Sequence, residues 1–252
     1  MSANRPFVLT IAGFDPSGGA GILADAKTFE QHHVYGLAVN TGNTIQTENE
    51  FFEIQWTDMA FVLNSIEKLF GNYTIKAVKI GIVPHLDYLR EIVFAVKRLS
   101  PKTKIVWDTV LRSSSEFDFI TIESQDNLIE ILKKIDIITP NYREIFQLSS
   151  EEINARIIGE NLSEYCDVLL KGGHNPDEIG VDYLYTGNKI FRLAPNNTSV
   201  SEKHGSGCVL SSAITANIAL EQDLKTACTN AKNYTETYLQ SNQTKLGYHD
   251  EY

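Results

Sequence analysis

Short apolar, β-rich segments alternate with segments of helical apolar spacing along most of the chain, and this alternation restricts the possible folds more than any other feature. Short apolar runs predict strands, and apolar residues three or four positions apart predict helices. The expected strands are 7–12, 39–45, 75–80, 104–107, 135–139 and 168–170, and the expected helices are 19–33, 61–70, 88–99 and 128–134. Strands that alternate with helices form βαβ units, in which helices cover both faces of a parallel sheet.

The pattern changes near residue 180. Two strand-like runs, 181–185 and 190–193, flank Thr186-Gly-Asn-Lys189, whose Gly-Asn pair predicts a hairpin turn. Helices are then expected over 208–220 and 224–240. We therefore predict an α/β fold, a three-layer α/β/α sandwich whose mostly parallel central sheet carries an antiparallel hairpin at one edge. The chain shows no linker, repeat or low-complexity segment, so residues 1–252 are expected to form a single domain.

Composition excludes several classes of protein. A net charge of −10 and a pI of about 5.1 disfavour binding to a nucleic-acid backbone. The chain has no apolar stretch of about 18 residues, so no membrane span is expected. No secretory signal is expected either, because the chain passes directly into a strand-like run, and its three cysteines include no CxxC pair, which argues against a disulfide framework and a structural zinc site. These features predict a cytoplasmic protein.

Polar residues follow the predicted strands where each strand ends. Because ligands bind beyond the carboxyl ends of parallel strands, we expect these residues to form one composite site. They are Asp15, Gln46, Gly81, Asp108, Asn141, Glu144 and Lys171.

The segment His204-Gly-Ser-Gly-Cys-Val-Leu-Ser211 precedes an apolar helical run. Backbone N–H groups at the start of a helix bind anions with help from the helix dipole, and the same potential favours the thiolate of Cys208. The segment therefore predicts a phosphate site beside a group that handles a proton. A glycine-rich turn whose Cys208 faces the core is the alternative interpretation.

A second glycine-rich segment spans residues 13–21, and the chain has no GxxxxGK[ST] motif. Gly19-Ala-Gly-Ile-Leu-Ala24 matches GxGxxA, which suggests a dinucleotide site, but residues 13–18 separate it from the strand and only Glu48 is available as a ribose ligand. Alternatively, Gly13 and Gly19 allow a small molecule to approach the backbone. Asp25 then either accepts hydrogen bonds from that molecule or complements the helix dipole.

Taken together, these segments resemble a known family. Residues 10–29, Thr-Ile-Ala-Gly-Phe-Asp-Pro-Ser-Gly-Gly-Ala-Gly-Ile-Leu-Ala-Asp-Ala-Lys-Thr-Phe, are similar to the N-terminal signature of the hydroxymethylpyrimidine/phosphomethylpyrimidine kinases, which are ribokinase-like enzymes of thiamine biosynthesis. The resemblance covers residues 7 to about 240. Further motifs match in the order Val78–Gly81, Thr139–Glu144, Lys171–His174 and His204–Cys208.

The resemblance implies a kinase that uses ATP and Mg²⁺ to phosphorylate 4-amino-5-hydroxymethyl-2-methylpyrimidine and then its monophosphate, and it implies a homodimer. Cys208 would be the base, with a thiol pKa that falls toward neutrality. Asp25 and Gln46 would bind the pyrimidine. The anion hole for the transferred phosphoryl group would consist of Gly205, Ser206 and Gly207. The residues for magnesium and the nucleotide phosphates would be Asp108, Asn141, Glu144 (through water) and Lys171.

The chain departs from the family in Thr109-Val-Leu-Arg-Ser-Ser-Ser-Glu116, which lacks the lysine and glycine of the family's Lys-Ser-Gly loop. That loop lies near the substrate phosphate in the family, so Arg112 would have to replace it electrostatically in the second phosphorylation. Asn141 and Glu144 also fit a helix capping box, and the same two residues can both cap a helix and position magnesium and the nucleotide phosphates. The alternatives to a pyrimidine kinase are a pyridoxal or pyridoxamine kinase and a catalytically inactive ligand-binding relative.

Overall fold

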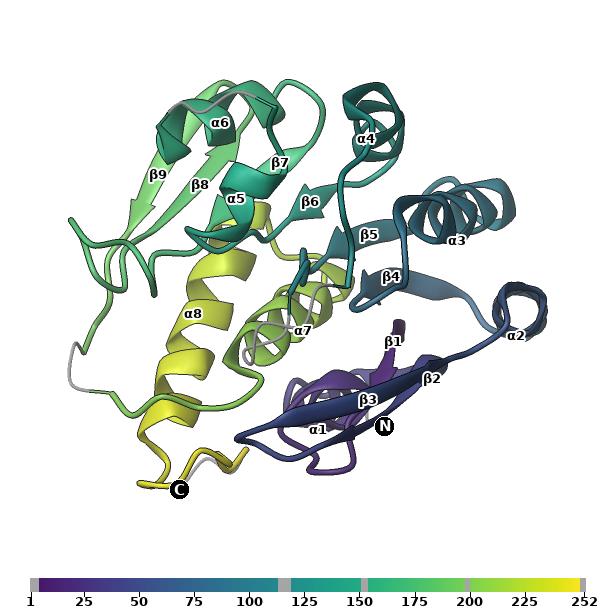
Figure 1. Ribbon diagram of the computed structural model, residues 1–252, viewed down its shortest axis with the longest axis horizontal. Coiled ribbons are helices and arrows are strands. Elements are labelled where there is room, and N and C mark those ends of the chain that lie inside the picture. Colours follow the sequence, from purple (N-terminus) through teal and green to yellow (C-terminus); the bar gives the residue numbers. More distant parts are fainter. Residues whose placement is uncertain (1–4, 113–118, 151–153, 198–199, 250–252) are drawn as a thin grey trace.

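The computed structural model describes residues 5–112, 119–150, 154–197 and 200–249. Within these residues, nine strands form one mixed sheet in the order β3-β2-β1-β4-β5-β6-β7-β8-β9 (Figure 1). The strands are β1 (Phe7–Phe14), β2 (Tyr35–Gln46), β3 (Phe51–Trp56), β4 (Ile75–Ile80), β5 (Lys104–Trp107), β6 (Ile137–Ile138), β7 (Asp167–Leu170), β8 (Asp182–Thr186) and β9 (Lys189–Leu193).

The six strands from β2 to β7 in this order pair in parallel, and both edges of the sheet are antiparallel. The predicted hairpin of β8 and β9 is confirmed, and Gly187 and Asn188 make its turn with φ of 53° and 62°. The antiparallel β3 at the opposite edge was not predicted. Its sequence, Phe51-Phe-Glu-Ile-Gln-Trp56, is rich in apolar residues, but all of its side chains are half-buried or exposed, as at the edge of a sheet.

Helices cover both faces of the sheet, which confirms the predicted three-layer sandwich (Figure 1). On one face α1 packs against α7, and α7 packs against α8; on the other face α2, α3, α4 and α6 follow one another across the sheet. The helices are α1 (Gly21–Gln31), α2 (Met59–Asn72), α3 (Leu86–Leu99), α4 (Gln125–Leu132), α5 (Glu144–Gln147), α6 (Ala155–Leu162), α7 (Ser206–Ala219) and α8 (Leu224–Gln240).

Helix α7 is buried on nearly all sides, because it contacts the sheet at β1, β4 and β5 and is also covered by α1 and α8. Its small residues, such as Ala213 and Ala216, permit this close packing. The packing fixes the N-terminus of α7 at the edge of the sheet where the parallel strands end. Among the helices that the structure describes, none is both long and apolar enough to cross a membrane.

The order of the strands reverses at β1. The chain adds β2 on one side of β1 and β4 on the other, so the connections diverge beyond the carboxyl ends of β1 and β4. Such a divergence leaves a crevice in which α/β proteins bind ligands. Gly13 and Gly81 lie at these two strand ends.

Candidate active site

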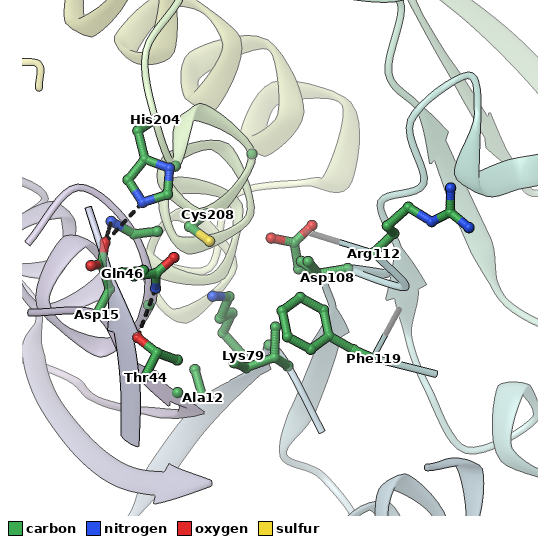
Figure 2. A pocket seen from close by; sticks show the side chains of 18 of the residues that line it. Ala12, Asp15, Thr44, Gln46, Lys79, Asp108, Arg112, Phe119, His204 and Cys208 are labelled. Carbon is green, nitrogen blue, oxygen red and sulfur yellow. Dashed lines mark hydrogen bonds and ion pairs between the residues drawn. The ribbon is translucent and has the colours of Figure 1, made fainter. Parts of the chain in front are cut away.

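A cavity opens at the carboxyl ends of β1, β2, β4 and β5 and holds about 840 Å³ of empty space, its open mouth included. The N-terminus of α7 closes one side of it (Figure 2). The structure thus brings together most of the residues that the sequence placed in one site. The predicted residues that line this cavity are Gly13, Asp15, Gln46, Gly81, Asp108, Arg112, Asn141, Glu144, Lys171, Gly205, Gly207 and Cys208.

Gln46 reaches this cavity from the last position of β2. Its side-chain amide nitrogen donates to the Thr44 hydroxyl at 2.9 Å, and that hydroxyl donates to the Phe14 carbonyl at 2.9 Å (Figure 2). This chain of hydrogen bonds orients the amide of Gln46. The amide carbonyl remains available to accept a hydrogen bond from a ligand.

The glycine-rich loop after β1 is organised by Asp15, whose buried carboxylate accepts from the backbone N–H groups of Ser17 and Ala20 at 2.9 and 2.8 Å. His204 also contacts it at 2.9 Å (Figure 2). Burial alone would raise the pKa of Asp15, but the hydrogen bonds from His204 and Ser17 outweigh it and keep the pKa low. Asp15 therefore joins the first loop to the loop that starts α7.

The glycines of these loops have a different role from the expected one. Gly205 has φ of +74°, and a Cβ there would lie 2.0 Å from the carbonyl oxygen of Gly19. Gly19 does not line the cavity; its Cα faces the His204 ring. Gly13 does line the cavity, but a Cβ on Gly13 would first meet Ile82. These glycines allow protein segments to pack closely, and the expectation that Gly19 admits a substrate to the backbone is corrected.

Asp25 lies under the cavity and outside its lining. The Lys79 ammonium donates to both of its carboxylate oxygens at 3.0 Å, and Ser212 and Thr10 donate to them at 2.6 and 2.5 Å. Since these groups are buried and the carboxylate is already satisfied, the expectation that Asp25 bonds the substrate directly is corrected. Its alternative interpretation as a helix-dipole residue is incomplete as well, because its principal partner is Lys79.

Cys208 faces the cavity from the first turn of α7 (Figure 2). The pKa of its thiol is raised to about 11: burial is the main cause and the carboxylates of Asp108 and Asp25 add to it, whereas the Lys79 ammonium and the Gly21 N–H act in the opposite direction. The thiol is therefore protonated at neutral pH. The expectation that the helix terminus alone makes Cys208 a thiolate is wrong for the ligand-free chain, because loss of solvent outweighs the local positive potential.

Asp108 follows β5 and is fully buried. The Lys171 ammonium donates to it at 3.1 Å, and the hydroxyls of Thr139 and Ser211 donate at 3.1 and 3.0 Å. Burial raises the pKa of Asp108, but the charges of Lys171 and Lys79 outweigh this effect and lower it overall. Asp108 therefore stays ionised in a buried position, which suits a ligand of cations.

Glu144 stands 3.9 Å from the Lys171 ammonium. Its carboxylate accepts from the Asn141 backbone N–H at 2.8 Å, while the Asn141 side chain accepts from the Glu144 backbone N–H at 2.9 Å, so the reciprocal hydrogen bonds of the predicted capping box are present, although α5 itself begins at Glu144. Burial raises the pKa of Glu144 to about 7, helped by the charge of Asp108 and opposed by Lys171. Glu144 is thus poised to lose its proton near neutral pH.

A second cavity of about 730 Å³, its open mouth included, lies beside the first, between α7, α8 and the segment after β7. It shares Asn141, Lys171 and Gly207 with the first cavity, so the two meet at these residues. Ser206 lines only this second cavity. Of the predicted anion-hole residues, Gly205 therefore faces the first cavity, Ser206 the second and Gly207 both.

Sequence reasoning missed Lys79 as a site residue. The signal was a lysine between Val78 and Ile80 in an otherwise apolar strand, where a charged side chain is rare without a partner. Arg112 lines the cavity far from Cys208, with its guanidinium pointing away from it (Figure 2). The expectation for the atypical loop reaches residues 113–116, which lie outside the described part of the chain.

Comparisons with known proteins identify the family to which the chain is similar. A family model described as phosphomethylpyrimidine kinase matches residues 15–251. The hydroxymethylpyrimidine/phosphomethylpyrimidine kinase of Aquifex aeolicus is 34% identical over 248 residues, which cover 95% of this chain and 97% of that protein.

Two solved structures are also similar. A phosphomethylpyrimidine kinase from Clostridium difficile superposes with a TM-score of 0.77 and 34% identity, covering 92% of this chain and 98% of that one. An ADP complex of Bacillus subtilis pyridoxal kinase superposes with a TM-score of 0.78 and 28% identity, covering 92% and 90%. The chain therefore belongs to the phosphomethylpyrimidine kinase family, a family of ribokinase-like phosphotransferases.

Proposed function

We propose that this chain, as one kinase domain over residues 1–252, transfers the γ-phosphoryl group of ATP to the hydroxymethyl group of 4-amino-5-hydroxymethyl-2-methylpyrimidine, and then phosphorylates the monophosphate, in thiamine biosynthesis. The observation that best supports this proposal is that two cavities meet at Lys171 and Gly207. Such a junction lets two ligands bind with their reacting ends close together, which phosphoryl transfer requires.

The first cavity suits the pyrimidine. Gln46 presents an oriented amide that complements an exocyclic amine and ring nitrogens. Apolar groups of Ala12, Ile82 and Phe119 complete the wall against which a flat ring can pack. Cys208 lies in the same cavity at the end toward α7 (Figure 2). A ring bound by Gln46 would direct its hydroxymethyl group toward that end.

The second cavity suits the nucleotide. The N-terminus of α7 offers the backbone N–H group of Gly207 to a phosphate, and the Lys171 ammonium adds a positive charge. In phosphoryl transfer the negative charge spreads over the oxygens of the moving group, so donors fixed in advance lower the barrier. These groups would stabilise that charge.

Cys208 is proposed as the base. The hydroxymethyl oxygen forms a bond to the γ-phosphorus while the bond from that phosphorus to the bridging oxygen breaks, and ADP leaves with the electron pair. The hydroxyl proton passes to the Cys208 sulfur in its thiolate form. The thiol pKa of about 11 makes this form rare at neutral pH, so turnover would rise with pH over the range in which the protein stays folded.

Asp108 and Glu144 are proposed to hold magnesium. Both present hard oxygen ligands, and Mg²⁺ is commonly bound by one or two carboxylates together with water and substrate phosphates. When bound, the ion would neutralise charge on the β- and γ-phosphates.

Pyridoxal phosphorylation is the second candidate, and the similarity to Bacillus subtilis pyridoxal kinase favours it. Gln46 in the first cavity and the higher identity to the pyrimidine kinases favour the pyrimidine. A catalytically inactive relative is disfavoured, since Asp108, Glu144 and Lys171 lie together with Cys208. Release of ADP on addition of each substrate to the protein and MgATP tests these possibilities.

We also propose a cytoplasmic homodimer. The free state of Cys166, Cys208 and Cys228 suits a reducing compartment. On the antiparallel edge of the sheet, Ile45 and Phe52 are 58% and 57% exposed, which suits burial against a second copy. Light scattering in solution measures the oligomeric state, and a monomeric mass would contradict the dimer.

A further inference from the structure

Lys79 carries a charge in the interior of the protein. It belongs to β4, its side chain exposes no surface, and it forms part of the cavity wall. Burial lowers the pKa of Lys79, but the negative charges of Asp25 and Asp108 outweigh this effect and raise it above the ordinary value. The side chain is therefore an ammonium at neutral pH.

Asp25 holds this ammonium in one place. Both carboxylate oxygens lie 3.0 Å from Lys79 Nζ, and donors from β1 and α7, Thr10 and Ser212, fix the carboxylate from other sides. Four segments of the chain thus meet at one buried ion pair. Stability does not account for such an arrangement, because apolar residues of similar volume often stabilise a core equally well or better than a buried ion pair.

The ammonium faces the Cys208 thiol. Figure 2 shows both side chains in the lining of the cavity, with the ammonium end of Lys79 pointing toward the sulfur of Cys208. The groups with the largest effect on this thiol are Lys79 from β4, Asp25 from α1, Asp108 after β5 and the N–H of Gly21, and the Lys171 ammonium after β7 also interacts with it. Both carboxylates oppose a negative charge on the sulfur, so the Lys79 ammonium is the main group that offsets them.

We infer that Lys79, held by Asp25, is a positioning residue of this kinase that stabilises the negative charge on Cys208 Sγ when the thiol gives up its proton. The inference rests on the proposed function in so far as Cys208 is the base there. It assigns Asp25 an indirect role, because the carboxylate fixes the cation and does not touch the substrate. Without the ammonium, burial and two carboxylates would leave the sulfur with little tendency to ionise.

Alkylation of Cys208 by iodoacetamide as a function of pH tests the inference directly, because only the thiolate reacts. Peptide mass spectrometry separates Cys208 from Cys166 and Cys228, which are both buried. In Lys79→Met the alkylation rate of Cys208 at about pH 9 should fall roughly tenfold or more, since one unit of pKa changes the thiolate fraction tenfold. Lys97→Met removes a lysine from an ion pair with Asp136 away from the cavity and should leave the rate unchanged.

A second variant controls for misfolding, because Lys79→Met leaves the buried carboxylate of Asp25 without its ion-pair partner. Asp25→Asn with Lys79→Met removes both charges, and its Cys208 should react more slowly than in the wild type but faster than in Lys79→Met, because loss of the Asp25 carboxylate partly offsets loss of the ammonium. A folded variant without Lys79 whose Cys208 reacts at the wild-type rate would overturn the inference. The test needs no turnover, so failure of the wild type to phosphorylate any substrate would contradict the proposed function alone. In an active enzyme, Lys79→Met should lower kcat much more than it changes KM for the pyrimidine.

Discussion

The Lys171 ammonium donates to the Asp108 carboxylate at 3.1 Å where the two cavities meet. Asp108 is fully buried, and the side chain of Lys171 is 12% exposed. The burial of Lys171 disfavours its charge, but the carboxylates of Asp108 and Glu144 outweigh this effect and raise its pKa. The pair therefore keeps both charges, and under the proposed function Lys171 would exchange part of its contact with Asp108 for an incoming phosphate.

Lys171→Met should lower kcat by roughly 10²-fold or more, because a fixed donor to the transferred group is lost. It should also reduce the free energy of unfolding by about 3 kcal/mol, since Asp108 is left buried without its partner. Steady-state kinetics and denaturant unfolding measure the two effects. Lys104→Met removes a lysine that is 55% exposed in its ion pair with Asp136, and both quantities should stay close to wild type. Equal losses in the two variants would contradict a special role for Lys171.

Glu144 should make magnesium binding depend on pH. With a pKa of about 7, its carboxyl group is mostly protonated below that pH, so the metal must displace a proton there. The half-saturating concentration of Mg²⁺ should fall roughly tenfold between about pH 6 and pH 8 and level off above that range. Magnesium titrations of the kinase rate at fixed ATP measure it. Glu144→Gln should bind magnesium more weakly and lose this pH dependence; a variant that retains it would show that another group titrates.

Cys208→Ala should lower kcat by roughly 10²-fold or more while the protein stays folded, the usual loss for a general base. The wild-type rate should rise with pH below the thiol pKa of about 11, and this rise should be absent from the residual rate of the variant. Rate measurements across pH on both proteins provide the comparison. Cys166→Ala is the matched control, because Cys166 is buried away from the cavity and its loss should leave kcat within about twofold. Near-wild-type activity of Cys208→Ala would reduce Cys208 to a packing residue.

Gly205→Ala should disturb the start of α7. Its φ of +74° is strained for alanine, and the added Cβ would lie 2.0 Å from the Gly19 carbonyl oxygen. The free energy of unfolding should fall by about 1–3 kcal/mol, and kcat should fall with it because the anion-binding N–H groups shift. Thermal unfolding and kinetics report both. Gly71→Ala adds a Cβ with no neighbour within 4 Å, and it should leave both quantities unchanged or raise stability slightly.

The layers of the fold and the composite site were predictable because they depend on local patterns. Apolar runs marked the buried strands, and the carboxyl ends of parallel strands meet at one edge of a sheet. Asp108, Asn141, Glu144 and Lys171 follow three such strands, so topology alone brings them together. Strand β3 was not predicted although most of its residues are apolar, and its place at the edge of the sheet follows from its antiparallel pairing with β2.

The remaining features depend on contacts between distant residues. Asp25 and Lys79 are 54 positions apart, and Asp15 and His204 are 189 positions apart. No spacing in the sequence reports such pairs. The pKa of Cys208 was mispredicted for the same reason, since the helix terminus is a local feature whereas burial and the carboxylates of Asp25 and Asp108 arise from the tertiary structure.

The central claim is tested most directly by an ADP-release assay on the full chain with MgATP. Hydroxymethylpyrimidine, its monophosphate and pyridoxal are supplied in parallel, and phosphorylated products are identified by mass spectrometry. We predict ADP formation and a matching phosphorylated product with both pyrimidines, at a higher kcat/KM than with pyridoxal. Release of ADP with pyridoxal alone would assign the site to the second candidate. No ADP above background with any of the three would contradict the kinase assignment.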